Sequence, residues 1–411
     1  MRARIARAVV ERGVRRFPVR LRYPDGREVG GGPPGSPAVE IVRPDALYRR
    51  LGEHPKIGLG EAYMAGDWRV ADGSDLAVFL RPFAERITEI VPPWMLRLRR
   101  VVDRAIPHHQ RNTINGSRRN IEAHYDLSNE LFTRFLDETL SYSSALFDPG
   151  RAMLEQTLEE AQRRKIDAAL DAAGVGDGTR LLEIGSGWGS LAIAAAERGA
   201  EVTTITLSSE QRELALERIE AAGLTDRIDV RLEDYRETRG EFDAIVSIEM
   251  IEAVGEEFWP IYFETIDARL APGGRVLIQA ILMEHDRYLA TRNSFGWIQK
   301  HIFPGGMIPS VKAIEEVIEG TSLQLDGSLA FGKSYAETLR RWRMSFLANW
   351  AQIARHGFDD RFKRTWEYYL AYCEAGFAAG YLDVAQLTFV KEPVAAHEVR
   401  SSPRERPAVH Q

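Results

Sequence analysis

The sequence has little cysteine, no long apolar run and no excess of positive charge. Its single cysteine, Cys373, cannot form an internal disulfide or a cysteine-rich metal site, which suits a reducing cytoplasm. No stretch approaches the ~18 uncharged apolar residues of a membrane-spanning helix, and no signal peptide is recognisable. The net charge of −6 gives no reason to expect nucleic-acid binding. No group of His, Asp and Glu has metal-ligand spacing, so we expect no metal.

Positive charge is nevertheless concentrated in two segments. Seven arginines lie between Arg97 and Arg119 against one acid, Asp103, and the first sixteen residues carry six arginines against Glu11. Basic stretches in an acidic protein suit a surface that meets phospholipid headgroups. A solvated helix face remains the alternative for either segment. A lipid partner would place the protein at the inner face of the membrane, as a peripheral protein of the cytoplasm.

Changes in composition divide the chain into four parts. Residues 1–95 predict a smaller α+β accessory domain, lipid-associated, which begins with an amphipathic helix and contains the Gly30–Gly35 break. Residues 96–120 predict a basic linker, and residues 121–392 the catalytic domain. Residues 393–411 are polar and contain proline, which is typical of a disordered tail.

Helical segments and short apolar strands alternate after Arg151. This alternation predicts an α/β fold with a doubly wound, seven-stranded, Rossmann-like sheet. Helices are expected at 153–173, 209–222 and 311–319, and a long aromatic-rich one at 335–377. Strands are expected at 180–184, 201–207, 228–232, 242–248 and 275–283.

A glycine-rich turn, Glu183-Ile-Gly-Ser-Gly-Trp-Gly189, follows the first of these strands. Gly185 and Gly187 allow the backbone to turn sharply and approach a ligand closely. A dinucleotide fold would have glycine at 190, where this chain has Ser190, and no Lys-Ser/Thr pair completes a P-loop. Glu183 would repel a pyrophosphate but attract a cationic amine, which favours S-adenosylmethionine over NAD.

Three further landmarks fit that cofactor. Thr206, Leu207 and Ser208 end the second strand, where a ribose contact belongs. Glu233, Asp234 and Tyr235 follow the third strand, where an acid can meet the adenine amino group and a ring can stack on it. The Ala271–Gly274 turn precedes a later strand. The order favours a class I S-adenosylmethionine methyltransferase; a Rossmann-like domain with another ligand is the alternative.

Several motifs narrow this prediction to one family. Asn120–Phe132, Tyr142–Phe147, Leu158–Lys165, Glu249–Gly255, Trp297–Gly306 and Phe331–Tyr335 resemble the cyclopropane fatty acid synthases and mycolic acid methyltransferases. The resemblance runs from about residue 50 to 390. It includes Gly60–Met64, which resembles the accessory domain of the phospholipid-acting branch.

The resemblance implies a set of cofactor-binding positions: Tyr142, Ser143, Glu183, Gly185, Ser186, Gly187, Trp188, Gly189, Thr206, Leu207, Ser208, Gln211, Asp234 and Tyr235. It also implies a bicarbonate ion as a bound base. The family holds this ion with a cysteine, a glutamate, a histidine, an isoleucine main chain and a tyrosine. Those catalytic positions are here Ser144, Glu252, Gln279, Ile281 and Tyr335, so the cysteine and the histidine are replaced.

Such an enzyme adds the sulfonium methyl group to an alkene and leaves a carbocation on the neighbouring carbon, which aromatic faces and negative groups stabilise. Proton loss with ring closure gives a cyclopropane, whereas a hydride shift before proton loss gives an exocyclic methylene. Glutamine cannot shuttle a proton at neutral pH. Gln279 and Glu252-Ala-Val-Gly255 resemble the actinobacterial branch that makes 10-methylene precursors of tuberculostearate from oleoyl phospholipid. Cyclopropane formation remains the alternative.

Other interpretations stay open from the sequence alone. Glu252 could be a structural acid, Tyr335 a core residue, and the aromatic run from Trp342 to Phe377 a helical core as well as an acyl pocket. A small-molecule methyltransferase would not need the basic linker, and a catalytically decayed lipid-binding scaffold would not need intact glycines at 185, 187 and 189.

The expected partners are a phospholipid bilayer and a flavin- or NADPH-dependent reductase; a homodimer is left open.

Overall fold

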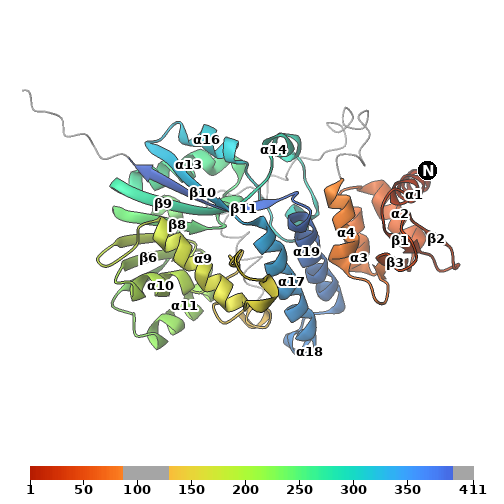
Figure 1. Cartoon of the computed structure of the whole chain (residues 1–411), viewed down its shortest axis with the longest axis horizontal. Helices are drawn as coiled ribbons and strands as arrows, with labels where there is room; N and C mark the ends of the chain where they lie inside the picture. The colour runs from red at the N-terminus through yellow and green to blue at the C-terminus, as the bar shows by residue number, and fades with distance from the viewer. Residues whose placement is uncertain (87–128, 392–411) are drawn as a thin grey trace, which may run out of the picture.

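The computed structural model describes residues 1–86 and 129–391. The basic segment 97–119, the motif residues 120–128 and the tail 393–411 lie outside the described residues. The described chain forms two sheets, one of four strands and one of seven, with helices around each (Figure 1).

The N-terminal part of the chain builds the four-stranded sheet, in the order β2-β1-β3-β4. Strand β1 pairs parallel with β3 and antiparallel with β2, and β3 pairs antiparallel with β4. Helix α1 packs on α2, and its Val14 is buried in the core. The elements are α1 (Arg2–Val14), β1 (Arg20–Arg22), β2 (Glu28–Val29), β3 (Ala38–Ile41), α2 (Pro44–Glu53), α3 (Gly58–Ala65), β4 (Trp68–Val70) and α4 (Leu76–Glu85).

The seven-stranded sheet has the order β10-β11-β9-β8-β5-β6-β7. Strands β5 to β9 are mutually parallel, and the edge formed by β10 and β11 is antiparallel. This is the expected α/β class, and it confirms the predicted number of strands. The strands are β5 (Arg180–Ile184), β6 (Glu201–Thr206), β7 (Ile228–Leu232), β8 (Phe242–Ile248), β9 (Leu270–Leu282), β10 (Leu323–Ala330) and β11 (Asp383–Lys391).

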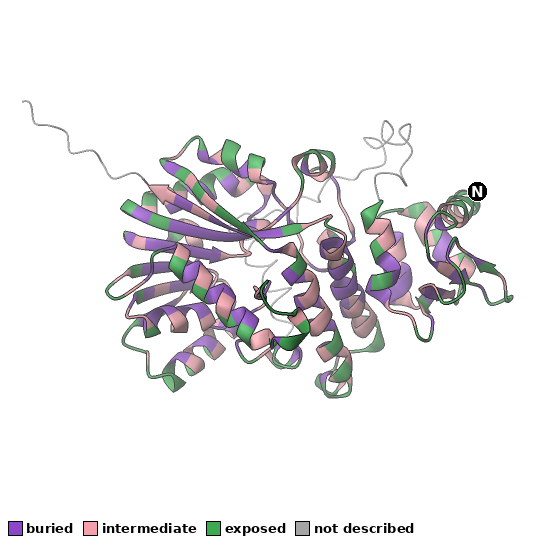
Figure 2. Cartoon of the chain, in the orientation of Figure 1, coloured by how far each residue is buried: buried purple, intermediate pink, exposed green. Residues whose placement is uncertain are grey.

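Alternating side chains of the central strands face two separate cores. Leu181 and Leu277 pack against α9, α10 and α11, whereas their neighbours Leu182 and Ile278 pack against α13 and α16. Both faces of the sheet are therefore covered, which is why its strands are nearly continuous apolar runs (Figure 2). The helices after residue 128 are α8 (Asn129–Phe132), α9 (Leu158–Ala172), α10 (Ser190–Glu197), α11 (Ser209–Ala221), α12 (Ile251–Val254), α13 (Trp259–Arg269), α14 (His285–Thr291), α15 (Trp297–His301), α16 (Val311–Ile318), α17 (Gly332–Ala348), α18 (Trp350–Ile353) and α19 (Asp360–Ala378).

Three predicted boundaries were wrong. The expected helix 153–173 begins at Leu158, because Thr157 and Glu160 form a reciprocal capping box there. The expected helix 335–377 is two long helices, α17 and α19. Gly357 interrupts it with a φ of 93°, and Asp359 caps the second helix. Strand β9 begins at Leu270 instead of 275, with an irregular register where it passes β8.

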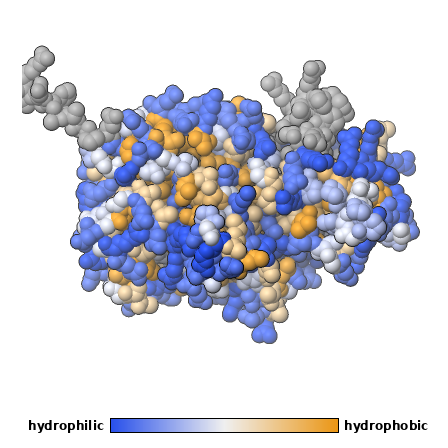
Figure 3. Space-filling view, in the orientation of Figure 1, coloured by the Kyte–Doolittle hydropathy of each residue, from blue (hydrophilic) through white to orange (hydrophobic). Residues whose placement is uncertain are grey.

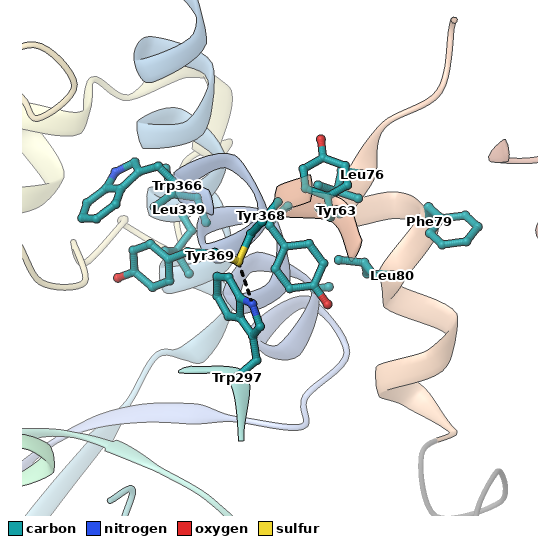
Figure 4. Close-up of a cluster of buried hydrophobic side chains, with 14 of the residues drawn as sticks. Tyr63, Leu76, Phe79, Leu80, Trp297, Leu339, Trp366, Tyr368 and Tyr369 are labelled. Atoms are coloured by element: carbon teal, nitrogen blue, oxygen red, sulfur yellow. Dashed lines mark hydrogen bonds between the residues drawn. The ribbon is translucent and has the colours of Figure 1, made fainter. Parts of the chain in front are cut away.

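The two sheets share one aromatic core through α3, α4 and α19. Tyr63 of α3 and Trp297 of α15 pack against the Tyr368 ring of α19 (Figure 4). Trp68 also contacts Tyr368, and Phe79 of α4 packs against Trp68. A Cβ on Gly60 would lie 2.5 Å from the Trp297 ring, so only glycine permits this approach.

Polar contacts seal the same junction. Glu61 accepts hydrogen bonds from Lys300 and His301, and the Trp297 indole donates to the Met64 sulfur at 3.3 Å. The segment after α15 then reaches the catalytic site, because the Met307 amide donates to the Glu252 carbonyl at 2.8 Å.

Candidate active site

A pocket lies at the carboxyl ends of β5, β6 and β8, where ligands bind in doubly wound sheets. The glycine-rich turn after β5 and the segments that follow β6, β7 and β8 line it. Eleven of the fourteen predicted cofactor positions line it: Tyr142, Ser143, Glu183, Gly185, Ser186, Gly187, Trp188, Thr206, Leu207, Gln211 and Tyr235.

The glycine turn forms the floor of the pocket. Gly185 and Gly187 have φ values of 96° and 48°, and a Cβ on Gly185 would lie 2.6 Å from the Met250 side chain. The turn is held by two amides, of Gly185 and Ser186, which both donate to the Ile205 carbonyl at 3.0 Å. Glycine is required here for the backbone conformation as well as for space.

Glu183 supplies the acid of this pocket. Burial raises its pKa to about 8, and one carboxylate oxygen accepts a hydrogen bond from Thr204 at 2.6 Å. A carboxylate in this position gains from a cationic partner, because the cation replaces the lost solvation. The amino group and sulfonium of S-adenosylmethionine fit that requirement, and the Tyr235 hydroxyl is buried nearby without a hydrogen-bond partner among the described residues.

Three predicted cofactor positions do not line the pocket. Asp234 turns away and forms an ion pair with Arg236 at 2.7 Å, and Glu233 lines the pocket instead. The Ser208 side chain caps α11, and Gly189 begins α10 with a φ of 86°. These three residues support the loops of the pocket.

Three of the five predicted catalytic residues, Ser144, Gln279 and Tyr335, contact an acid that the sequence did not single out, Glu249. One oxygen of its carboxylate accepts hydrogen bonds from the Ser144 amide at 2.8 Å and from the Gln279 side chain at 2.9 Å. The other oxygen accepts one from the Tyr335 hydroxyl at 2.6 Å. Glu249 is one of the residues that line the pocket.

These contacts change the expected role of the family's bicarbonate site. Ser144, Gln279 and Tyr335 direct their donors to Glu249, and the Ile281 amide donates to Glu252 at 2.5 Å. The Ser144 hydroxyl donates to the Ala145 carbonyl at 3.0 Å, so each donor expected for the ion is already engaged within the protein. The residues present therefore do not fit a bicarbonate ion, and Glu249 supplies a carboxylate in its place.

Backbone conformation and charge mark Glu249 as unusual. Its φ is 53°, a left-handed conformation that non-glycine residues seldom adopt outside functional sites. Burial raises its pKa, whereas the hydrogen bonds from Tyr335, Ser144 and Gln279 and the charge of Lys165 lower it. A raised pKa together with hydrogen bonds that favour the ionised form suits a general base.

Glu252 lies close to the same carboxylate, and its surroundings favour the protonated form of its own carboxyl group. Burial and the charge of Glu249 raise its pKa to about 8, and its second oxygen has no hydrogen-bond partner among the described residues. Two neighbouring buried carboxyl groups do not both ionise readily. The pair thus favours one negative charge, on Glu249, which accepts hydrogen bonds from Ser144, Gln279 and Tyr335 and lies near the charge of Lys165.

Lys165 of α9 connects the two acidic parts of the pocket and was also missed. Its ammonium donates to the Ser143 hydroxyl at 2.8 Å and faces Glu249 and Glu183. Burial lowers the pKa of Lys165 to about 8, while the nearby acids raise it. The Leu158–Lys165 motif was the available signal, but lysines on helices are usually exposed.

Aromatic rings form the wall beyond these acids. Tyr142 packs against Phe132, Phe135 and Trp342, and its hydroxyl lies 2.8 Å from the Tyr369 hydroxyl. Tyr335 packs against Phe377 with ring centroids 4.4 Å apart. Such a wall can stabilise a cation and exclude water.

Comparison with known proteins gives the same assignment. Residues 112–387 match the family model described as mycolic acid cyclopropane synthetase. The chain is 47% identical to a tuberculostearic acid methyltransferase of Mycobacterium tuberculosis, covering 95% of this chain and 92% of that one. It is 33% identical to the cyclopropane-fatty-acyl-phospholipid synthase of Escherichia coli, covering 85% and 87%.

Solved structures agree. A mycolic acid cyclopropane synthase complexed with SAH and CTAB superposes with a TM-score of 0.60 at 29% identity, covering 70% of this chain and 99% of that one. The cyclopropane synthase MmaA2 of Mycobacterium tuberculosis gives 0.61 at 30% identity, with the same coverage. The chain therefore belongs to the mycolic acid cyclopropane synthetase family and is an S-adenosylmethionine-dependent methyltransferase.

Proposed function

We propose that the protein methylates the double bond of an oleoyl chain in a phospholipid and converts that chain to a 10-methylene acyl chain. The observation that carries this proposal is Glu249, a residue of the pocket lining whose carboxylate accepts hydrogen bonds from Ser144, Gln279 and Tyr335. An alkene methyltransferase needs a fixed base beside the reacting carbons, and Glu249 meets that need. The 47% identity to a tuberculostearic acid methyltransferase supports the same product class.

Bound S-adenosylmethionine supplies the methyl group as an electrophile. The glycine turn and Glu183 would orient the cofactor, and Tyr142, which lines the pocket and packs on Trp342, would help to keep water from the acyl chain. The alkene electron pair forms the new C–CH₃ bond as the S–CH₃ bond breaks, which leaves a cation on the neighbouring carbon. Tyr142, Tyr335 and the negative Glu249 stabilise that cation.

Glu249 then completes the reaction. A hydride shift moves the cation to the methylated carbon, and one Glu249 oxygen accepts a proton from the new methyl group. The released C–H electron pair forms the exocyclic double bond. The products are the 10-methylene chain, S-adenosylhomocysteine and one proton on Glu249. A flavin- or NADPH-dependent reductase acting next would convert the methylene to a methyl branch.

Cyclopropane formation is the second candidate, supported by the 33% identity to a cyclopropane-fatty-acyl-phospholipid synthase. It would use the same base, with ring closure in place of the hydride shift. Gln279 remains our candidate for the residue that favours the methylene. If the Gln279→His variant gave an unchanged product, Gln279 would have no part in that choice.

We further propose that α1 carries the protein to the membrane from the cytoplasmic side. Met1, Ile5 and Val9 are exposed at i, i+4 spacing, and Ile5 is 58% exposed. Five arginines of the N-terminal segment form no ion pair among the described residues: Arg2, Arg4, Arg12, Arg15 and Arg16. An apolar stripe flanked by arginine suits an anionic phospholipid surface.

Other surface observations are compatible with a peripheral attachment. No described helix combines the length and apolar character needed to cross a bilayer. The face drawn in Figure 3 carries hydrophobic residues in patches among hydrophilic ones. Because residues 1–95 contain α1, we assign them as the membrane-associated accessory domain. Measurement of the molecular mass in solution would test whether two copies form a homodimer.

The test is incubation of the pure protein with S-adenosylmethionine and liposomes of oleoyl phospholipid, followed by mass spectrometry of the acyl chains. A methylene-branched C19 chain is expected. A cyclopropane product would keep the family and replace the proposed product. S-Adenosylmethionine binding without any methylated lipid would reject the proposed substrate.

A further inference from the structure

A second buried glutamine, Gln386, lies beside the catalytic one. Strands β9 and β11 pair antiparallel with Gln386 opposite Gln279, and the two side chains are 3% and 0% exposed. The Gln386 amide group donates to the Gln279 side-chain oxygen at 3.2 Å and to the Lys165 carbonyl at 3.0 Å. Two buried polar side chains in the sheet interior need such partners, since an unpaired amide there is costly.

This contact determines which end of the Gln279 amide faces the base. A glutamine amide has a donor end and an acceptor end of nearly the same shape. Gln386 donates to the acceptor end, so the NH₂ end points to Glu249 at 2.9 Å and to the Ser144 carbonyl at 3.3 Å. The reversed amide would place its oxygen against the Glu249 carboxylate and repel it.

We propose that Gln386 is a positioning residue that fixes the Gln279 amide with its NH₂ group toward Glu249 and thereby keeps Glu249 ionised for proton abstraction. The inference rests on the proposed role of Glu249 as the base. Gln386 lines neither the pocket nor the aromatic wall, so it acts through Gln279.

The charged and titratable groups around Glu249 define what the test must separate. Lys165 faces it from α9, Glu252 from α12 and Tyr335 from α17. Gln386 also holds the Lys165 main chain, which is a structural contact of α9. A role through Gln279 and a role through α9 predict different results when Gln279 is already absent.

The experiment is a double-mutant cycle on the full-length protein with oleoyl phospholipid liposomes. Methionine matches the length of glutamine and lacks its hydrogen-bonding atoms, so the variants are Gln386→Met, Gln279→Met and both together. Gln386→Met is expected to lower kcat at pH 7 about tenfold, the loss typical of one hydrogen bond to a charged group. The acidic limb of its kcat–pH profile is expected to move to higher pH, because Glu249 loses a stabilising donor.

In the Gln279→Met background, Gln386→Met should have no further effect on kcat or on the limb. Additive losses, or a uniform loss of kcat with an unmoved limb, would overturn the inference. Thr388→Val, two residues along the same strand face, is the matched control and should retain wild-type kcat. If Gln386→Met does not fold by circular dichroism, Gln386→Leu takes its place in the cycle. A wild-type protein without activity would instead reject the proposed function.

Discussion

The cofactor part of the pocket and the base part are built in different ways. The cofactor part is built mainly from short segments that follow β5, β6 and β7, with the glycine turn at its centre and Tyr142 and Ser143 beside it. The base part draws Ser144, Glu249, Gln279 and Tyr335 from segments up to 191 positions apart, at 144 and 335. The first part depends mostly on backbone conformation, and the second on hydrogen bonds between distant side chains.

The two parts also handle charge differently. Glu183 lies buried with one hydrogen bond from Thr204 and gains its stabilisation when a cation binds. Glu249 is stabilised by the protein's own donors before any substrate arrives. Substitutions in the two parts should therefore separate cofactor affinity from proton abstraction.

Removal of the proposed base should have the largest effect. Glu249→Gln keeps the size of the side chain but cannot accept the proton, so kcat is expected to fall 10²–10⁴-fold. The affinity for S-adenosylmethionine, measured by calorimetry, should stay within a few-fold. Glu217→Gln on the exposed surface of α11 is the control. Near-normal kcat of Glu249→Gln would contradict the assignment of the base.

Removal of the Tyr335 hydroxyl should have a smaller, pH-dependent effect. This hydroxyl stabilises the ionised form of Glu249, so Tyr335→Phe raises the pKa of Glu249. The protonated fraction then persists to higher pH, and kcat at pH 6–7 should fall roughly tenfold or more. The deficit should shrink as the pH rises, because Glu249 becomes ionised in both proteins. A deficit that is constant from pH 6 to 9 would argue against this role.

Neutralisation of Glu183 should affect the cofactor part alone. Glu183→Gln removes the carboxylate that faces the cationic cofactor, and the affinity for S-adenosylmethionine is expected to fall about tenfold. The ratio of acyl products at saturating cofactor should not change. Glu201→Gln at the exposed start of β6 serves as control. A changed product ratio would show that the two parts are not separable.

Loss of the exposed α1 residues should have the smallest effect on chemistry. The Ile5→Gln/Val9→Gln double variant is expected to bind anionic liposomes several-fold more weakly in a sedimentation assay, because burial of apolar side chains at the bilayer surface is lost. Activity on detergent-dispersed phospholipid should remain unchanged. Val78→Gln, at an exposed position of α4, is the matched control. Equal binding of all three proteins to liposomes would move the membrane contact elsewhere.

Much of the cofactor part was predictable, because its signals are local. The strand–turn–helix at Glu183–Gly189, the end of β6 at Thr206, and Tyr235 in the turn after β7 lie where the sequence predicts. The position of Asp234 outside the pocket lining has an equally local reason. Its neighbour Glu233 points into the pocket, and an acidic pair on a turn does not reveal which acid turns inward.

The base part was predicted only through family resemblance, and incompletely. Ser144, Gln279 and Tyr335 were expected to hold an ion, and their true common partner, Glu249, stood within the Glu249–Gly255 motif as an ordinary acid. Two acids three residues apart after a buried strand were the available signal. No sequence signal marked Gln386, because nothing in the local pattern shows that this glutamine of β11 lies opposite Gln279 of β9.

The sequence by itself determined the alternation of strands and helices, the glycine turn and the acid that favours a cationic cofactor. These features depend on interactions between neighbouring residues, whose preferences the local pattern contains. Only the tertiary structure decided that Glu249 replaces the expected ion and that Gln386 orients Gln279. Both depend on register between strands and on helix packing, which bring together donors and acceptors that the chain separates by more than a hundred residues.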